Sequence, residues 1–226
     1  MPPSEIPPFA RELEQLTQSL NLPDAKLTRR WLDSELLALW LLDTDDSLEM
    51  DTQAIGRFWQ KLPFWAFAWA GGRALASYIA SHPELVEGKR VLDFGCGSGI
   101  AGIAAGLAGA DEVWMADLDQ NALIAAKVNG ALNGIDINVV AHGDWPEVDV
   151  VLAADVLYDI SSSDDLQALT LAVPEWLLAE SKAVAPDFVR LQCLDTLNTS
   201  TLPVIGDFDE DVQIGIYCRQ HQVTLN

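Results

Sequence analysis

Residues 91–99 read VLDFGCGSG, and this stretch decides the fold. A short apolar strand with an acidic residue runs into a turn in which glycine takes every second position: Gly95, Gly97 and Gly99. Glycine has no Cβ, so a ligand can approach the backbone of such a turn closely. Residues 100–110 are small and apolar and predict a helix, whose free N–H groups would face that ligand. The sequence therefore predicts a strand–turn–helix site for a cofactor.

The spacing of the glycines separates two kinds of cofactor. The dinucleotide fingerprint G-x-G-x-x-G fits only on Gly97, Gly99 and Gly102, which puts its first glycine well past the end of the strand. When it starts at Gly95, its sixth position is isoleucine and the fingerprint fails. The pattern D-x-G-x-G-x-G, which starts at Asp93, fits throughout. It resembles the first motif of class I S-adenosylmethionine-dependent methyltransferases, which implies S-adenosylmethionine as the cofactor.

The composition favours one globular domain with a strongly acidic surface. The chain has 226 residues, half of them hydrophobic, which suits a single sizeable core and excludes a disordered chain. The formal charge is -21, from 34 acidic and 13 basic residues. Such a surface repels phosphate backbones, so nucleic acid is not expected as a substrate. It would attract a basic protein or an amine, although the charge can equally serve solubility alone.

The cysteines and the apolar runs favour a cytoplasmic protein. Cys96, Cys193 and Cys218 make no metal-binding spacing and cannot all pair, which suits a reducing compartment. The first residues carry no basic apolar signal, and runs such as residues 36–42 are too short to span a bilayer. We therefore expect no metal and no membrane partner.

The chain divides into two parts by its patterns. Residues 1–62 predict an N-terminal helical extension, with helices over 9–20, 24–42 and 47–61. Residues 63–226 alternate between strands and helices and predict a doubly wound, mainly parallel sheet. The expected strands are 90–94, 113–117, 137–141, 148–155 and 182–185, then a C-terminal antiparallel hairpin of 202–208 and 212–219. The expected helices are 73–80, 100–110, 121–132 and a region over 164–180 broken near Pro174.

Acidic residues follow the second and third expected strands, where a parallel sheet binds its ligands. Asp117 closes the second strand, and its carboxylate could accept hydrogen bonds from both hydroxyls of a ribose. The alternative is that Asp117 and Asp119 cap a helix, as we expect of Asp119. Asp144 and Trp145 follow the third strand. A methyltransferase places adenine there, although Asp also favours a plain turn.

Residues 155–159, Asp-Val-Leu-Tyr-Asp, follow the fourth strand and carry the most specific resemblance. They are similar to a motif of the seven-strand, lysine-modifying protein methyltransferases. That motif is an acidic residue followed three residues later by Tyr or Phe, and Asp155 and Tyr158 match it. Residues 63–72, PFWAFAWAGG, look like a segment of the electron-transfer-flavoprotein β-subunit lysine methyltransferases in which a Trp contacts the cofactor, here Trp69.

Two further stretches, residues 91–110 and the triplet Asp117, Leu118 and Asp119, resemble the ribosomal-protein methyltransferases. The resemblance covers about residues 63–190 and implies a seven-stranded sheet. It departs from the lysine group at residues 185–190, which read APDFVR where a Gly-Asp-Pro-Gly-Arg-like loop is usual, next to the substrate opening.

These residues suit the methylation of a protein amine, with lysine favoured. An aromatic mouth would lower the pKa of a lysine amine and so favour its nucleophilic form. The candidate wall residues are Trp65, Phe67, Trp69 and Tyr158. Asp155 would bind and orient the amine, and Tyr158 would be a wall or a hydrogen-bond partner, unless it only packs on the sheet. The alternatives are a methyltransferase of small molecules, an NAD-dependent oxidoreductase and a non-catalytic binding module.

Overall fold

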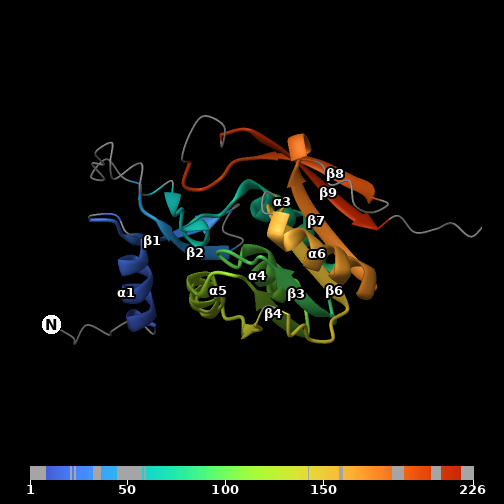
Figure 1. Cartoon of the computed structure of the whole chain (residues 1–226), viewed down its shortest axis with the longest axis horizontal. Coiled ribbons are helices and arrows are strands. Elements are labelled where there is room, and N and C mark those ends of the chain that lie inside the picture. The colour runs from blue at the N-terminus through green and yellow to red at the C-terminus, as the bar shows by residue number, and fades with distance from the viewer. Residues whose placement is uncertain are drawn as a thin grey trace, which may run out of the picture.

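The fold centres on a seven-stranded sheet with the strand order β5-β4-β3-β6-β7-β9-β8 (Figure 1). This computed structural model describes residues 9–20, 22, 24–32, 37–44, 58, 60–141, 143–157, 160–184, 191–204 and 210–219. Strands β5, β4, β3, β6 and β7 pair in parallel, and β9 is antiparallel to both β7 and β8. The strands are β3 (Arg90–Phe94), β4 (Glu112–Ala116), β5 (Asn138–Val139), β6 (Val150–Ala154), β7 (Glu175–Ser181), β8 (Leu191–Thr199) and β9 (Val212–Arg219). The predicted mainly parallel sheet with antiparallel C-terminal strands is confirmed.

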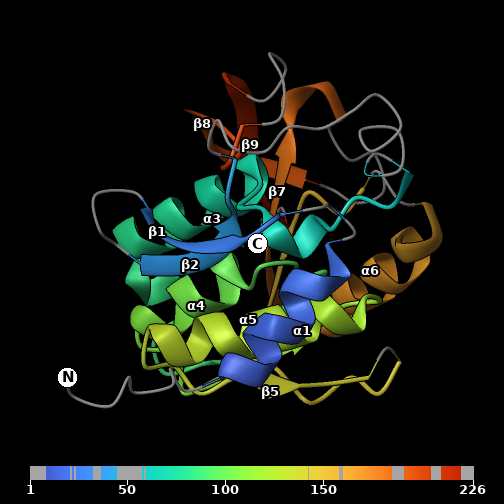
Figure 2. The same cartoon turned by 90° about the vertical axis from the view of Figure 1, so that its left-hand side faces the viewer.

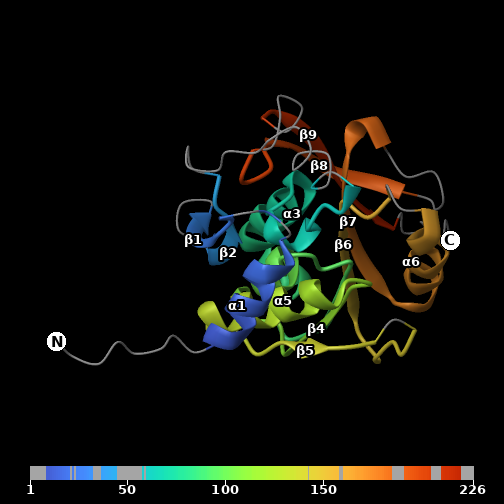
Figure 3. The same ribbon diagram turned by 60° about the vertical axis from the view of Figure 1, so that its left-hand side comes forward.

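Helices cover both faces of the sheet, as Figure 3 shows. Buried residues of α3 and α4 share a core with β3, β6, β7 and β9, and α5 packs beside them over β4. Helix α6 packs on the opposite face. The helices are α1 (Ala10–Ser19), α3 (Ala70–Ser81), α4 (Ile100–Leu107), α5 (Gln120–Leu132) and α6 (Ile160–Ala172). Among the described helices, none is both long and apolar enough to cross a bilayer.

The N-terminal part contains a β-hairpin where the sequence predicts a helix. Strands β1 (Leu27–Leu32) and β2 (Leu37–Leu42) form an antiparallel pair, so the helix expected over residues 24–42 is wrong. Nearly every side chain of β2 is buried, so the strand shows no alternation of apolar and polar residues. A continuous apolar run of this length does not distinguish a strand from a helix.

The other N-terminal expectations have different outcomes. The first helix is confirmed as α1. The segment expected over 47–61 lies outside the described residues, apart from residues 58, 60 and 61. The hairpin packs against α4 and α5 in one core with the sheet (Figure 2). The boundary at residue 62 therefore does not separate two hydrophobic cores.

Two expectations near the C-terminus are also wrong. Residues 175–181 form β7 rather than the end of a helix, and Lys182–Val184 is a 3-10 turn rather than a strand. The apolar run of β7 is buried on both faces between β6 and β9, so again no period reveals it. Strand β9 pairs with β8. Of the strand expected over 202–208, residues 205–208 lie outside the described residues, and Leu202 forms an isolated bridge with Ala68.

Candidate active site

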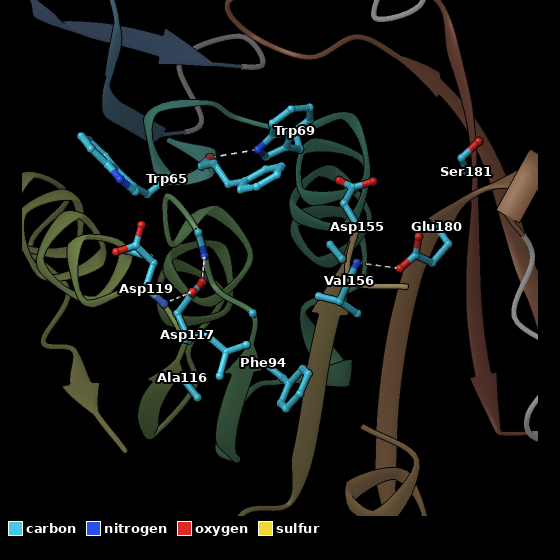
Figure 4. Close-up of a pocket in the computed structure, with 16 residues that line it drawn as sticks. Trp65, Trp69, Phe94, Ala116, Asp117, Asp119, Asp155, Val156, Glu180 and Ser181 are labelled. Atoms are coloured by element: carbon cyan, nitrogen blue, oxygen red, sulfur yellow. Dashed lines mark hydrogen bonds between the residues drawn. The ribbon is translucent and has the colours of Figure 1, made fainter. Parts of the chain in front are cut away.

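A cavity of about 530 Å³ opens at the carboxyl ends of β3, β4, β6 and β7 (Figure 4). Aromatic side chains from the segment before α3 lie along one side of it, and carboxyl groups approach it from several strand ends. The residues that the argument uses are Trp65, Trp69, Gly97, Asp117, Asp155 and Glu180. This edge of a doubly wound sheet is where such folds bind ligands.

The glycine turn after β3, residues 95–99, forms the floor of the cavity through Gly95 and Gly97. Gly97 has a φ of 51°, and a Cβ there would have only the Phe64 carbonyl oxygen nearby, at 4.0 Å. Glycine at this position therefore leaves the backbone open to a ligand. Gly99 is different: it is the N-cap of α4, with a φ of 84°, and it packs against Ala126 of α5 and does not line the cavity.

Asp93 supports the turn from behind instead of lining the cavity. Its side chain is buried, and its Oδ2 accepts a hydrogen bond of 2.8 Å from the backbone N–H of Gly102. Burial raises the pKa of this carboxyl to about 7. The structure thus gives Asp93 a contact with α4 and gives Gly95 and Gly97 the contact with the cavity.

Asp117 lines the cavity where β4 ends, beside the exposed Leu118. Its Oδ2 accepts from the backbone N–H of Gly97 and its Oδ1 from that of Asp119, both at 2.9 Å. Burial raises the pKa of Asp117. Each carboxylate oxygen has a further lone pair, so the group can still accept hydrogen bonds from two ligand hydroxyls. Asp119 caps α5, as predicted, by accepting from the N–H of Asn121.

Asp155 lies directly after β6 in a left-handed conformation, with a φ of 52°. Its Oδ2 accepts a 3.2 Å hydrogen bond from the backbone N–H of Gly72, in the first turn of α3. A non-glycine residue rarely adopts this conformation, which indicates that its surroundings impose it. The strained turn aims the carboxylate at the cavity, which it lines (Figure 4).

Glu180, near the end of β7, lines the cavity beside Asp155 and is only 4% exposed. Its Oε1 accepts hydrogen bonds from the backbone N–H groups of Val156, at 2.8 Å, and Leu157, at 3.1 Å. Burial and the charge of Asp155 raise the pKa of Glu180 to about 8. Two neighbouring carboxyls of this kind can bind a cation and hold a proton near neutral pH.

The sequence interpretation missed Glu180, because it assigned residues 164–180 to a helical region. The available signal was a lone acidic residue at the end of an otherwise apolar run, WLLAES. Charged residues are rarely buried without a partner or a function.

The aromatic side of the cavity is a packed cluster. Trp65 is fully buried, and Trp69 donates from its Nε1 to the Phe64 carbonyl oxygen at 2.9 Å. The Trp69 ring lies 5.6 Å from that of Phe64 and 5.5 Å from that of Phe67. Phe67 is buried behind Trp69 and does not line the cavity, unlike the other members. These contacts fix the Trp69 ring at the opening.

Two further predicted residues, Asp144 and Trp145, do not line the cavity. Asp144 is exposed and does not line the cavity. Trp145 packs its ring 5.6 Å from that of Phe94, which does line it, so Trp145 supports the wall from behind. Tyr158 lies outside the described residues, as does the segment 185–190 that departs from the lysine group.

Comparison with known proteins agrees with this geometry. Residues 77–167 match the family described as "Ribosomal protein L11 methyltransferase (PrmA)". This match covers less than half of the chain and shows similarity to that family over residues 77–167. The matched range contains the glycine turn, Asp117 and Asp155, whereas Trp65, Trp69 and Glu180 lie outside it.

Two groups of curated relatives are similar to this chain. The electron transfer flavoprotein beta subunit lysine methyltransferase of Danio rerio is 36% identical over 150 residues, 59% of this chain and 57% of that protein. The ribosomal protein L11 methyltransferase of Dichelobacter nodosus is 30% identical over 176 residues, 76% of this chain and 58% of that protein. The chain therefore spans less than two thirds of the length of either relative.

Solved structures show the same fold. The tRNA (uracil-54, C5)-methyltransferase of Pyrococcus abyssi, in complex with S-adenosyl-L-homocysteine, superposes with a TM-score of 0.53 at 15% identity, over 85% of this chain and 44% of that one. The magnesium protoporphyrin IX methyltransferase of Synechocystis with bound SAM superposes with a TM-score of 0.50 at 17% identity, over 76% of this chain and 86% of that one. Both superpositions show that this chain shares its fold, a mainly parallel sheet covered by helices, with these two structures.

Proposed function

We propose that this protein is an S-adenosylmethionine-dependent methyltransferase that N-methylates a protein side chain, with lysine as the favoured acceptor. The observation that carries this proposal is one continuous cavity, which joins the glycine turn and Asp117 to Asp155, Glu180 and the aromatic cluster. A cofactor site and an acceptor site would thus share one space. The relatives named lysine and ribosomal-protein methyltransferases support a protein acceptor.

The cavity fits S-adenosylmethionine, which would supply a methyl group on a positively charged sulfur. The backbone at Gly95 and Gly97 is open to the ligand, and Asp117 would accept hydrogen bonds from the ribose hydroxyls. Trp69 and Leu118 would form walls of the same site. Asp144 and Trp145 remain our candidates for the adenine side, with Trp145 acting through Phe94.

The acceptor amine must lose a proton before it can attack. A lysine amine has an ordinary pKa of about 10.4, so its neutral form costs roughly 4–5 kcal/mol at pH 7. A water-poor mouth built by Trp65 and Trp69 lowers this cost. Asp155 would bind and orient the amine, and alignment with the methyl group would supply much of the rate. Tyr158 keeps its proposed place as a wall of this mouth.

Of the two carboxyls, Glu180 is the better proton acceptor. An aspartate with an ordinary pKa of about 3.9 is a weak base toward an ammonium ion. The pKa of Glu180, about 8, lies much closer to that of lysine. Asp155 would therefore hold the cation while Glu180 takes the proton.

The charge of the chain supports a basic protein as the partner. With a formal charge of -21, the surface favours positively charged segments and disfavours nucleic acid. None of the three cysteines forms a disulfide. Free cysteines support our expectation of a reducing, cytoplasmic location.

The proposal is tested by methyl transfer into a cell lysate. The protein is incubated with methyl-labelled S-adenosylmethionine and lysate, and the products are separated into macromolecular and small-molecule fractions. We expect label in protein, on lysine after hydrolysis, and none with the Asp155→Ala variant. Label only in small molecules would replace the protein acceptor with a small one. Binding of the cofactor without transfer to either fraction would indicate a non-catalytic module.

A further inference from the structure

Asn129 of α5 connects two segments that lie far from it in the sequence. Its Oδ1 accepts a 2.8 Å hydrogen bond from the backbone N–H of Trp40 in β2. Its Nδ2 donates a 2.9 Å hydrogen bond to the carbonyl oxygen of Ser98 in the glycine turn. The side chain has no exposed surface, and Ser98 is buried as well. One buried amide therefore joins the N-terminal hairpin to the turn that floors the cavity.

The orientation of this amide is fixed by its partners. The backbone nitrogen of Trp40 only donates, so it must face the amide oxygen, and the carbonyl of Ser98 only accepts, so it must face the NH₂ group. Both ends of Asn129 are satisfied at once. Either bond would leave a buried polar group unpaired if it were lost.

Asn133, four residues further along at the end of α5, also bonds to the hairpin, and its Nδ2 donates in addition to the carbonyl oxygen of Asn129 at 2.7 Å. Its Oδ1 accepts from the N–H of Ala38 at 2.9 Å, and its Nδ2 donates to the carbonyl of Ala38 at 2.7 Å. Four residues of helix rise about 6 Å, and two residues of strand about 6.6 Å, so the two asparagines match alternate residues of β2. They occupy the edge of β2 that β1 leaves open. The partners described for Asn133 do not include the glycine turn.

The glycine turn is held at two consecutive residues. The N–H of Gly97 donates to Asp117, and the carbonyl of Ser98 accepts from Asn129. Gly99 lies directly on α5, because a Cβ there would be 3.1 Å from the Cα of Ala126. The position of the backbone that faces the cavity thus depends on α5 and on the amide at its centre.

We propose that Asn129 is a positioning residue for the cofactor. Through this residue, the hairpin of β1 and β2 supports the cofactor site without lining the cavity. The inference rests on the proposed function, in that the ligand of the turn is S-adenosylmethionine. Docking of β2 fixes the amide, and the amide fixes the carbonyl of Ser98. The hairpin therefore acts on cofactor affinity through one hydrogen-bonded side chain.

The test compares Asn129→Asp with Asn133→Asp in the full-length chain. Each substitution keeps the oxygen that accepts from β2 and replaces the NH₂ donor with an oxygen. We expect Asn129→Asp to weaken binding of S-adenosylhomocysteine, measured by calorimetry, by about tenfold or more. Asn133→Asp should lower the thermal midpoint of unfolding to a similar degree and leave this affinity unchanged. Equal affinities in the two variants would overturn the proposal.

The introduced carboxyl also allows a rescue by pH. When it is protonated, its O–H can donate to the carbonyl of Ser98 and restore the lost bond. The ratio of the Asn129→Asp dissociation constant to that of the wild type should fall toward one as the pH is lowered from 8 to 5. Division by the wild-type value removes the titration of Asp93 and Asp117, which both proteins share. A ratio that does not change with pH would contradict the role of this bond.

A ligand-free readout separates this inference from the proposed function. Amide hydrogen exchange at residues 95–99 should be faster in Asn129→Asp than in the wild type, and unchanged in Asn133→Asp. If the wild type fails to bind S-adenosylhomocysteine, the proposed cofactor is wrong, yet faster exchange still supports the link from the hairpin to the turn. Unchanged exchange in both variants would refute the link itself.

Discussion

Gly71 of α3 touches the carboxylate of Asp155, so closely that a Cβ at position 71 would lie 2.6 Å from each carboxylate oxygen. The neighbouring residue, Gly72, donates its backbone N–H to the same carboxylate. Backbone atoms in the first turn of α3 thus contact the Asp155 carboxylate, which lines the cavity. The carboxylate therefore occupies the space that a Cβ at position 71 would need.

Replacing Gly71 with alanine should displace Asp155 and lower turnover. The added methyl group needs the space that the carboxylate occupies, so we expect kcat to fall by about tenfold or more, because orientation of the acceptor is lost. The affinity for S-adenosylhomocysteine, measured by calorimetry, should be unchanged. Gly72→Ala is the matched control, since its Cβ would crowd Ile100 at 2.7 Å rather than Asp155. Equal losses of kcat in both variants would contradict this account.

Glu180→Gln should change how stability depends on pH. The pKa of Glu180 is raised from 4.5 in the unfolded chain to about 8 in the folded state. Below about pH 4.5 the carboxyl is protonated in both states; above it, ionisation is more costly in the folded state, so stability falls as the pH rises to about 8. The glutamine variant should therefore become more stable than the wild type by more than about 1 kcal/mol at pH 8, but not at pH 4.

Urea unfolding at several pH values measures this difference. Glu87→Gln is the control, because Glu87 is exposed in the turn before β3. Asp93, with its pKa raised to about 7, also makes the stability fall as the pH rises over a similar range. Asp93 is present in both the wild type and the Glu180→Gln variant. A Glu180→Gln difference that is the same at pH 4 and pH 8 would show that Glu180 is not buried as described.

The same variant tests the proton acceptor. Glutamine can still accept the N–H groups of Val156 and Leu157, so the turn after β6 should keep its position. It cannot take a proton from the amine. The pH profile of kcat/KM reports the ionisations of the free enzyme. We expect kcat/KM of the wild type to rise with pH near 8, and we expect this rising limb of the profile to be absent in Glu180→Gln. An identical limb in both proteins would assign it to another group.

Asp117→Asn should weaken cofactor binding without unfolding the chain. The amide keeps an oxygen for one backbone N–H, but it loses the charge that would accept from the ribose hydroxyls. We expect the dissociation constant of S-adenosylhomocysteine to rise by about tenfold or more. Asp111→Asn, at an exposed position just before β4, should have no effect on this dissociation constant. Normal binding by Asp117→Asn would remove the ribose assignment.

The sequence predicted the fold best where a motif marks the end of a strand. Residues 90–94 match β3 in both bounds, because the D-x-G-x-G-x-G turn ends the strand at a fixed place. The hairpin and β7 were missed, because β2 and β7 are buried on both faces and show no period. What makes β2 a strand is its pairing with β1 and with Asn129 and Asn133 of α5, which are tertiary contacts.

The candidate site was predictable in part for similar reasons. The residues that the sequence predicted and the structure brings to the cavity are Trp65, Trp69, Gly95, Gly97, Asp117, Leu118 and Asp155. Asp93 and Gly99 belong to the same motif but serve the turn from behind, a distinction that spacing does not contain. Glu180 was hidden, since its role depends on β7 lying beside β6.

The most direct test of the central claim is a calorimetric titration of the full-length protein with S-adenosylhomocysteine, and separately with NAD. The account predicts saturable binding of S-adenosylhomocysteine at one site per chain, abolished by Gly97→Val, whose side chain would enter the cavity. It predicts no binding of NAD. Saturable binding of NAD, or S-adenosylhomocysteine binding that Gly97→Val leaves intact, would contradict it.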